Sequence, residues 1–233
     1  MYPLLIVSGI TSGLIGNYSS DTAVVSKLLP PGFAFGVWAP IYLIGLWAAF
    51  KIAKGTISPT TNGLLQICLG YFFSGLWIRF DGHTYVVAFL AISTLLMNLW
   101  GVYMLQKSVI SPYLLNGFAV FAAWITIATS LTISDALKIS DSSDLIVAVY
   151  LTGALIVAFA LYFLVAPLYG YIGVISWVTF SLLFQQNVSG TPITIVAAVA
   201  LIASAMIIVL AIRGNSDGLA ARKGLAQGPH SGL

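Results

Sequence analysis

Aromatic side chains at helical spacing are the residues of this sequence with the clearest potential chemistry. Phe35, Trp38 and Tyr42 follow one another at intervals of three and four positions, so a helix would place them on one face. Aromatic rings stack on flat apolar molecules, and they also pack well against one another. The spacing therefore leaves two interpretations open: a packed helix face inside a bundle, or a wall for a flat apolar ligand.

These rings belong to the stretch Leu28–Ala49, LLPPGFAFGVWAPIYLIGLWAA. The prolines that open it suit the start of a helix, where the missing N–H would have no intrahelical partner. Pro40 differs because it removes a backbone hydrogen bond further along and crowds the carbonyl of Gly36. We therefore expect one helix over this stretch, with a bend at Pro40.

The composition indicates a membrane protein. Of 233 residues, 60% are hydrophobic and only 6% are charged, against about 25% charged in an average soluble domain. Such a chain cannot cover a water-facing surface, so we expect it to lie in a lipid bilayer. The net charge of +3 comes from scattered groups rather than a basic stripe, which argues against a nucleic-acid partner.

The apolar segments predict an all-α, polytopic membrane bundle of about eight transmembrane helices. The candidate spans are Tyr2–Gly16, Pro31–Ile52, Asn62–Ile78, Tyr85–Leu105, Pro112–Ile133, Leu145–Leu164, Tyr169–Gln185 and Pro192–Ile212. Only residues 165–168 separate the sixth span from the seventh, so a bundle of seven helices is the alternative.

Charged residues fall between, beyond or, for Lys51, at the very end of these spans. With eight helices, one side carries six basic residues and one acidic residue: Lys51, Lys54, Lys107, Arg213, Arg222, Lys223 and Asp217. The other side carries three basic and five acidic residues: Lys27, Arg79, Lys138, Asp21, Asp81, Asp135, Asp141 and Asp144. Because basic residues concentrate on the cytoplasmic side, we expect both termini in the cytoplasm. Seven helices would erase the asymmetry, which favours eight.

The only charged residue inside a predicted span is Lys51, one position before the end of Pro31–Ile52, so no charge lies near a bilayer centre. This argues against a pump, a proton-coupled carrier or a voltage sensor. The sequence also lacks the common nucleophile, metalloprotease and phosphate-loop patterns. We therefore name no catalytic residue and favour a protein that is not an enzyme, without settling that question. His83 is a weak candidate axial ligand for a haem iron or a chlorophyll magnesium, and a solvated loop histidine is the alternative. We expect no other metal site.

Two segments carry a resemblance to a known family. PPGFAFGVWAPIY resembles the signature PPxWxF…VWxxLY at the start of the second helix of the translocator protein family, also called tryptophan-rich sensory proteins or peripheral benzodiazepine receptors. Residues 112–132 are similar to the fifth helix of that family, whose core reads WxxFAxxLN. The matching positions are Pro30, Pro31, Phe35, Trp38, Tyr42, Trp124, Ala128 and Leu131, with Gln66 matching a third-helix glutamine. Phe33 stands where the signature has tryptophan, and Thr132 where it has asparagine.

The resemblance implies a five-helix bundle over residues 1–133, with a cavity that opens toward the loop between the first two helices. Family members bind porphyrins, haem, sterols or synthetic aromatic compounds. The ligand-binding residues carried over to this chain are Phe33, Phe35, Trp38, Tyr42, Gln66, Trp124, Ala128 and Thr132. Residues 134–212 look like the three added helices of a longer, eight-helix subgroup, and we expect residues 213–233 to form a flexible cytoplasmic tail.

The sequence thus predicts a membrane protein that binds or carries a planar hydrophobic ligand. A tetrapyrrole (porphyrin, haem or chlorophyll-type pigment) is the leading class, and the sequence does not identify the cofactor. The expected partners are the bilayer, this small molecule, and other membrane proteins or a second copy of the chain. The alternative is a non-catalytic accessory subunit of a larger membrane complex, such as a photosynthetic one. Small-residue pairs typical of helix contacts suggest it: Gly9/Gly13, Gly32/Gly36 and Ala200/Ser204.

Overall fold

The computed structural model describes residues 1–15, 27–58, 63–80, 84–108, 110–165, 168–184 and 191–226. Within these ranges the chain is helical and has no strand, which confirms the all-α fold class. The α-helices and the 3₁₀ helices (η) are α1 (Tyr2–Ile15), η2 (Gly32–Val37), α2 (Trp38–Ala53), α3 (Leu64–Arg79), α4 (Thr84–Leu105), α5 (Pro112–Ala136), η3 (Ile139–Asp141), α6 (Asp144–Leu164), α7 (Tyr169–Leu182) and α8 (Thr191–Ala226).

Among the described residues, five segments are long and apolar enough to cross a membrane: Gly32–Ala53, Tyr85–Leu105, Pro112–Ala136, Asp144–Leu164 and Pro192–Ile212. The other three helices, α1, α3 and α7, are apolar but shorter. The 14 residues of α1 rise only about 21 Å, less than the roughly 30 Å of a hydrocarbon core. The structure supports a membrane helical bundle, and complete spans by these three helices stay a prediction.

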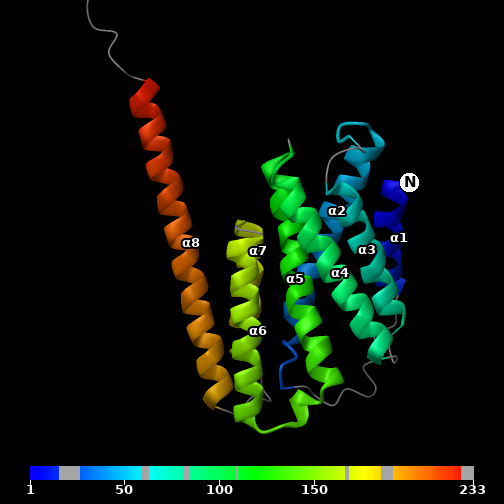
Figure 1. Cartoon of the computed structure of the whole chain (residues 1–233), viewed down its shortest axis with the longest axis vertical. Coiled ribbons are helices and arrows are strands. Elements are labelled where there is room, and N and C mark those ends of the chain that lie inside the picture. The colour runs from blue at the N-terminus through cyan, green and yellow to red at the C-terminus, as the bar shows by residue number, and fades with distance from the viewer. Residues whose placement is uncertain are drawn as a thin grey trace, which may run out of the picture.

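The first five helices close into a ring. Contacts run from α1 to α2, from α2 to α5, from α5 to α4, from α4 to α3, and from α3 back to α1. The remaining helices are added to one side of this ring, because α7 packs on α5 and α8 packs on both α7 and α6. Figure 1 shows α8, in orange, at the edge of the bundle, with its upper part leaning away. α5 is therefore shared by the ring and the added helices.

α5 is buried on nearly every side. Between positions 117 and 126, every residue except Val120 is buried. Gly117, Ala119, Ala122 and Ala123 are small enough for neighbouring helices to approach closely. A Cβ at Gly117 would lie 2.6 Å from Cγ2 of Ile44 on α2. A helix that is apolar all round is one that other helices surround, and α5 takes that position here.

The aromatic stretch forms two helical segments rather than one. Gly32–Val37 winds as the 3₁₀ helix η2, and the α-helix begins at Trp38. Pro40 consequently lies in the first turn of α2, where N–H groups have no α-helical partner. The expectation of one continuous helix is therefore wrong, because the helix type changes just before Trp38. The bend at Pro40 stays a prediction.

α6 and α7 form a hairpin. The carbonyl of Val165, at the end of α6, accepts a hydrogen bond from Nε2 of Gln106 just beyond α4 (2.6 Å). The N–H of Gly170, in the first turn of α7, donates to Oδ1 of Asn116 near the start of α5 (3.0 Å). From there α7 packs along α5. The structure thus has two separate helices here, and the number of membrane-spanning helices stays a prediction.

Charged side chains lie at two opposite ends of the bundle. Lys51 and Lys54 end α2, and Lys107 follows α4, at the upper end in Figure 1. At the lower end, Nζ of Lys27 forms an ion pair with Oδ1 of Asp144 at the start of α6 (2.8 Å). This separation agrees with the two groups of charges expected from the order of the spans.

α8 is longer than the sequence indicates. Its apolar part spans Pro192–Ile212, but the helix continues to Ala226. The flexible tail expected from Arg213 is therefore helical over residues 213–226, and residues 227–233 lie outside the described ranges.

We predict that Gly170→Ala weakens the contact between α7 and α5. A Cβ at position 170 would overlap the carbonyl oxygen of Asn116, so the two helices would have to separate. We expect thermal unfolding in detergent to show a loss of about 1–3 kcal/mol.

Gly173→Ala is the matched control in the same helix, because a Cβ there meets nothing within 4 Å. It should leave stability unchanged or raise it by about 0.5–1 kcal/mol. Equal stabilities of the two variants would contradict the close packing of α7 on α5.

Candidate ligand site at an aromatic group

Four of the predicted ligand-binding residues meet in the structure. The ring centroids of Phe35 and Trp124 are 5.4 Å apart at an interplanar angle of 80°, and those of Trp38 and Trp124 are 6.0 Å apart at 78°. Trp38 also stacks on Tyr42 at 5.3 Å and 29°. Edge-to-face and stacked pairs at these distances are favourable. We call Phe35, Trp38, Tyr42 and Trp124 the aromatic group.

Three elements position the aromatic group. Phe35 comes from η2, and Trp38 and Tyr42 come from the first two turns of α2. These two residues are four positions apart and therefore share a face of the helix. Trp124 lies midway along α5, which packs against α2. The contact between α2 and α5 is thus what closes the group.

Phe121 and Tyr71 extend the aromatic group toward α3. The ring of Phe121 lies 6.4 Å from that of Trp38 and 4.3 Å from that of Tyr71. Oη of Tyr71 donates a hydrogen bond to the carbonyl of Ile41 (2.9 Å). Neither ring was among the residues predicted from the sequence, although the spacing of three between Phe121 and Trp124 was a usable signal.

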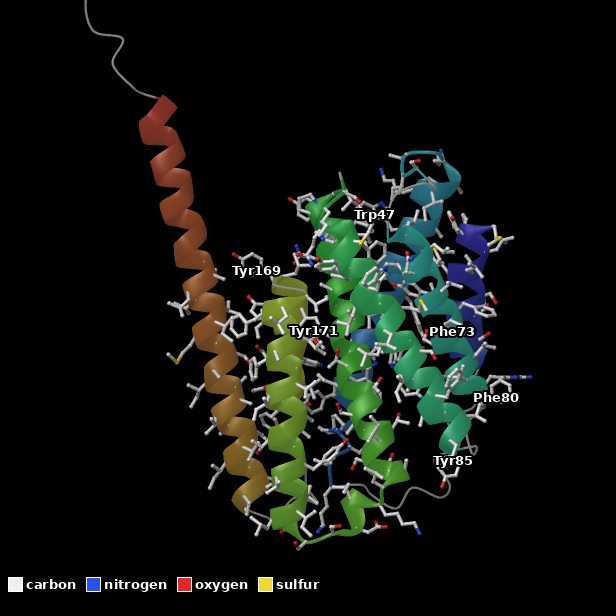
Figure 2. The ribbon with its side chains drawn as sticks, in the orientation of Figure 1. Trp47, Phe73, Phe80, Tyr85, Tyr169 and Tyr171 are labelled. Atoms are coloured by element: carbon white, nitrogen blue, oxygen red, sulfur yellow. The ribbon has the colours of Figure 1, made fainter. Side chains whose placement is uncertain are left out.

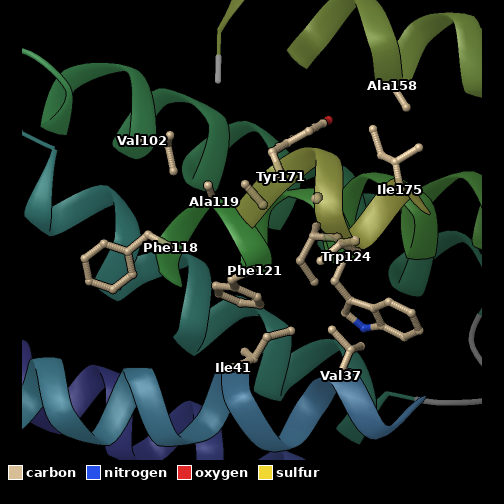
Figure 3. Packing of buried hydrophobic residues seen from close by; sticks show 14 of the residues in the cluster. Val37, Ile41, Val102, Phe118, Ala119, Phe121, Trp124, Ala158, Tyr171 and Ile175 are labelled. Atoms are coloured by element: carbon tan, nitrogen blue, oxygen red, sulfur yellow. The ribbon is translucent and has the colours of Figure 1, made fainter. Parts of the chain in front are cut away.

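Trp124 holds a buried hydrogen-bond donor that has no acceptor. The residue is 1% exposed, and within the described part of the chain no atom accepts a hydrogen bond from Nε1. Figure 3 shows this nitrogen on the side of the ring that faces the apolar side chain of Val37. A buried donor left without a partner costs about 1–3 kcal/mol. The aromatic group therefore contains an unused donor.

Phe33 lies apart from the aromatic group. Phe33 is 48% exposed, and its ring lies edge-on to Trp177 of α7 at 5.7 Å and to Phe184, just beyond α7, at 6.3 Å. Residues two positions apart in a helix point to different sides, which explains why Phe33 and Phe35 diverge. Nε1 of Trp177 also donates to the carbonyl of Ala34 (3.1 Å). α7 thereby holds η2 on the side away from the aromatic group.

The other predicted residues lie outside the aromatic group. Ala128 and Thr132 continue the Trp124 face of α5 at intervals of four, and both are half-buried. Oγ1 of Thr132 donates to the carbonyl of Ala128 (3.0 Å), so that hydroxyl bonds within its own helix. Gln66 is half-buried in the first turn of α3, and no described hydrogen bond links it to the aromatic group. His83 lies outside the described residues.

Three cavities with described linings lie elsewhere. One of about 40 Å³ is enclosed by α5, α6 and α7, a groove of about 250 Å³ runs between α6 and α8, and one of about 460 Å³ lies where α2 ends and α5 begins. None of the three is lined by a residue of the aromatic group. A drug-sized ligand needs about 300–1,000 Å³. A flat ligand that reaches the N–H of Trp124, a residue only 1% exposed, would have to separate the packed rings of the aromatic group.

The aromatic group can bind a ligand by ring stacking and by one hydrogen bond. Its rings present π-faces to an apolar plane, and the indole N–H of Trp124 can donate to an acceptor on that plane. Among the described residues, no group of three or more His, Cys, Asp or Glu could hold a metal ion. The aromatic group is therefore better suited to binding a flat, uncharged part of a ligand than to acid–base catalysis.

Comparison of the chain with models of protein families, with curated proteins and with solved structures gives no match. The resemblance to the translocator protein family therefore stays a prediction that rests on the matching residues.

We predict that Trp124→Phe is harmless to the ligand-free protein, whereas Trp177→Phe is not. At Trp124, loss of buried volume costs about 1 kcal/mol, and removal of an unsatisfied donor offsets this by about 1–3 kcal/mol. At Trp177, the change deletes the hydrogen bond to Ala34 and should lower stability by about 1 kcal/mol. Unfolding of both variants in the same detergent provides the measurement. A larger loss for Trp124→Phe would mean that its N–H already has an acceptor.

Proposed function

We propose that this chain is a multi-pass membrane protein that binds or carries a flat hydrophobic ligand at the aromatic group, with tetrapyrroles as the leading class. The observation that carries the proposal is the buried indole N–H of Trp124, which has no acceptor and lies beside the rings of Phe35 and Trp38. A ligand that brings both a π-surface and an acceptor would relieve the cost of that unpaired donor.

Porphyrin, haem and chlorophyll-type pigments fit this description. Each is a large flat ring that stacks on aromatic side chains, and each carries oxygen atoms at its edge that can accept a hydrogen bond. The resemblance to the translocator protein family points to the same class of ligand. Its support is strongest at Phe35, Trp38, Tyr42 and Trp124, the four carried-over residues that lie together.

The helix η2 is the element whose displacement would open the aromatic group. It carries Phe35 and leads directly into Trp38. A Cβ at Gly32 or Gly36 would meet nothing within 4 Å, so part of the surface of η2 is open. The hydrogen-bond geometry of a 3₁₀ helix is also poorer than that of an α-helix. Movement of η2 away from α5 would separate Phe35 from Trp124 and admit the edge of a planar ligand.

For the orientation in the membrane, we propose that both chain termini face the cytoplasm. The support is the position of Lys51, Lys54 and Lys107 at one end of the bundle, which is also the end where α1 begins. Basic residues near span ends favour the cytoplasmic side.

A second candidate function is a non-catalytic accessory subunit of a larger membrane complex, and α8 favours it. Only 17% of the apolar window of α8 is buried inside the chain, and its upper part projects away from the other helices in Figure 1. The small residue Gly9 does not support this candidate, because it packs against α3 of the same chain. A Cβ at Gly9 would overlap the carbonyl of Tyr71 on α3. Migration of the protein alone after mild detergent extraction would exclude this candidate.

A porphyrin titration tests the first proposal. We expect purified protein to bind protoporphyrin IX or haem saturably at micromolar concentration, measured by the absorption change of the ligand. Trp38→Ala and Trp124→Phe should each weaken binding about fivefold or more, because each removes about 1 kcal/mol of stacking or hydrogen bonding.

Trp100→Phe is the control for this titration. Trp100 is exposed on α4 and contacts Tyr103 rather than the aromatic group, so its replacement should leave the affinity unchanged. Absence of saturable binding, or equal affinities of wild type and both site variants, would refute the proposal.

A further inference from the structure

The largest of the three cavities lies apart from the aromatic group and is lined by charged, hydroxyl-bearing and apolar side chains. It has a volume of about 460 Å³ and lies between the end of α2 and the start of α5. We call it the α2–α5 cavity. The lining residues that matter here are Trp47, Lys51, Thr56, Ile110, Ser111 and Leu114. Figure 2 shows Trp47 near the upper end of the bundle, and Lys51 and Lys54 follow it at the end of α2.

Lys51 brings a positive charge into this cavity without a carboxylate beside it. Within the described residues the ion pair is between Lys27 and Asp144, at the opposite end of the bundle. The described interaction of the Lys51 ammonium is with the ring of Trp47, 5.9 Å from the ring centroid. The ammonium of this half-buried lysine favours an anion as its neighbour.

The start of α5 adds hydrogen-bond donors to the same cavity. Ser111 is the N-cap residue of α5, and its side chain makes no capping hydrogen bond. The N–H groups of the first turn, from Tyr113 and Leu114, have no carbonyl four residues earlier within the helix to donate to. The N-terminus of a helix also carries a partial positive charge. Ser111 and Thr56 both line the cavity and supply hydroxyls.

The carbonyl groups at the end of α2 could repel an anion in this cavity, but the three near Lys51 already accept hydrogen bonds. The carbonyl of Lys51 accepts hydrogen bonds from the N–H groups of Thr56 (2.9 Å) and Ile57 (3.3 Å). The preceding and following carbonyls, of Phe50 and Ile52, accept from the N–H groups of Lys54 and Gly55, both at 3.0 Å. These four bonds occupy the carbonyl groups that would otherwise repel an anion.

The remaining wall of the cavity is apolar. Leu114 comes from α5 and Ile110 from the connection just before it, and Trp47 is 40% exposed. Indole rings favour the headgroup boundary of a bilayer. A cavity with an unpaired ammonium and hydroxyls on one side and apolar side chains on the other matches a molecule that is anionic at one end and apolar at the other.

We propose that the α2–α5 cavity binds the phosphate headgroup of a membrane lipid. The ammonium of Lys51 faces the phosphate, the first turn of α5 with Ser111 donates hydrogen bonds to it, and Trp47, Ile110 and Leu114 contact the adjoining glycerol and acyl carbons. This site is separate from the aromatic group and does not depend on what that group binds.

Native mass spectrometry of the full chain, released from a neutral detergent, tests this proposal. Dioleoylphosphatidylglycerol is titrated against the wild type, with dioleoylphosphatidylcholine as the zwitterionic comparison. We expect one tightly bound phosphatidylglycerol. Lys51→Met should weaken it about fivefold, the factor associated with one basic residue at an anionic lipid surface, and Lys51→Arg should retain it.

Lys54→Met is the matched control. Lys54 also ends α2 and lies over an aromatic ring, that of Phe50 at 5.0 Å, but it does not line the cavity. Its replacement should leave phosphatidylglycerol binding unchanged. If Lys51→Met fails to fold, judged by circular dichroism and gel filtration, Thr56→Asp on the exposed turn should produce the same loss by charge repulsion.

A competition experiment with inorganic phosphate distinguishes binding of a lipid headgroup from binding of a free anion. Millimolar inorganic phosphate should fail to displace phosphatidylglycerol if the acyl carbons contribute to binding. Displacement by inorganic phosphate would overturn the lipid assignment and leave a simple anion site. Equal affinities of wild type and Lys51→Met, or equal binding of the two lipids, would overturn the proposal altogether.

Discussion

The packing of neighbouring helices around α5 is the constraint on which the rest of the structure depends. α5 contacts α2 and α4 in the ring and α7 on the other side. Such contacts require small residues, because apolar side chains gain nothing from leaving lipid and must gain from close van der Waals packing instead. Gly117 permits the approach of Ile44, and Gly170 permits the approach of α7 to Asn116. The aromatic group exists because α2 lies this close to α5.

The aromatic group is well packed but not fully satisfied. Its edge-to-face and stacked pairs contribute about 0.5–1.5 kcal/mol each, whereas the unpaired donor of Trp124 costs about as much or more. A ligand that replaces ring–ring contacts by ring–ligand contacts loses little stacking and gains a hydrogen bond. Because the closed arrangement must first open, the apparent affinity would be lower than the intrinsic affinity by the fraction of open protein. We expect η2 to be the segment that moves, because a Cβ at either of its two glycines would meet nothing within 4 Å.

The all-helical class and the positions of most helices follow from the sequence, because apolar length and periodicity are local properties. The meeting of Phe35, Trp38 and Tyr42 with Trp124 was predicted through the family resemblance, since spacing alone left packing and ligand binding equally open. The contacts of Phe33 could not be read from the sequence, because they depend on α7, whose Trp177 is over 140 positions away along the chain. The unpaired state of the Trp124 donor depends in the same way on what surrounds it in three dimensions. The extension of α8 to Ala226 was missed because a Gly- and Ser-containing segment is typical of loose ends.

The most direct test of the proposed binding site follows the indole N–H of Trp124 itself. With ¹⁵N-indole-labelled tryptophan in detergent-solubilised protein, the cross-peak that disappears in Trp124→Phe identifies this group. Binding of protoporphyrin IX at the aromatic group predicts that this cross-peak moves on addition of the ligand, while that of Trp100 stays in place. A Trp124 cross-peak that does not move while the ligand is bound would contradict a site at the aromatic group.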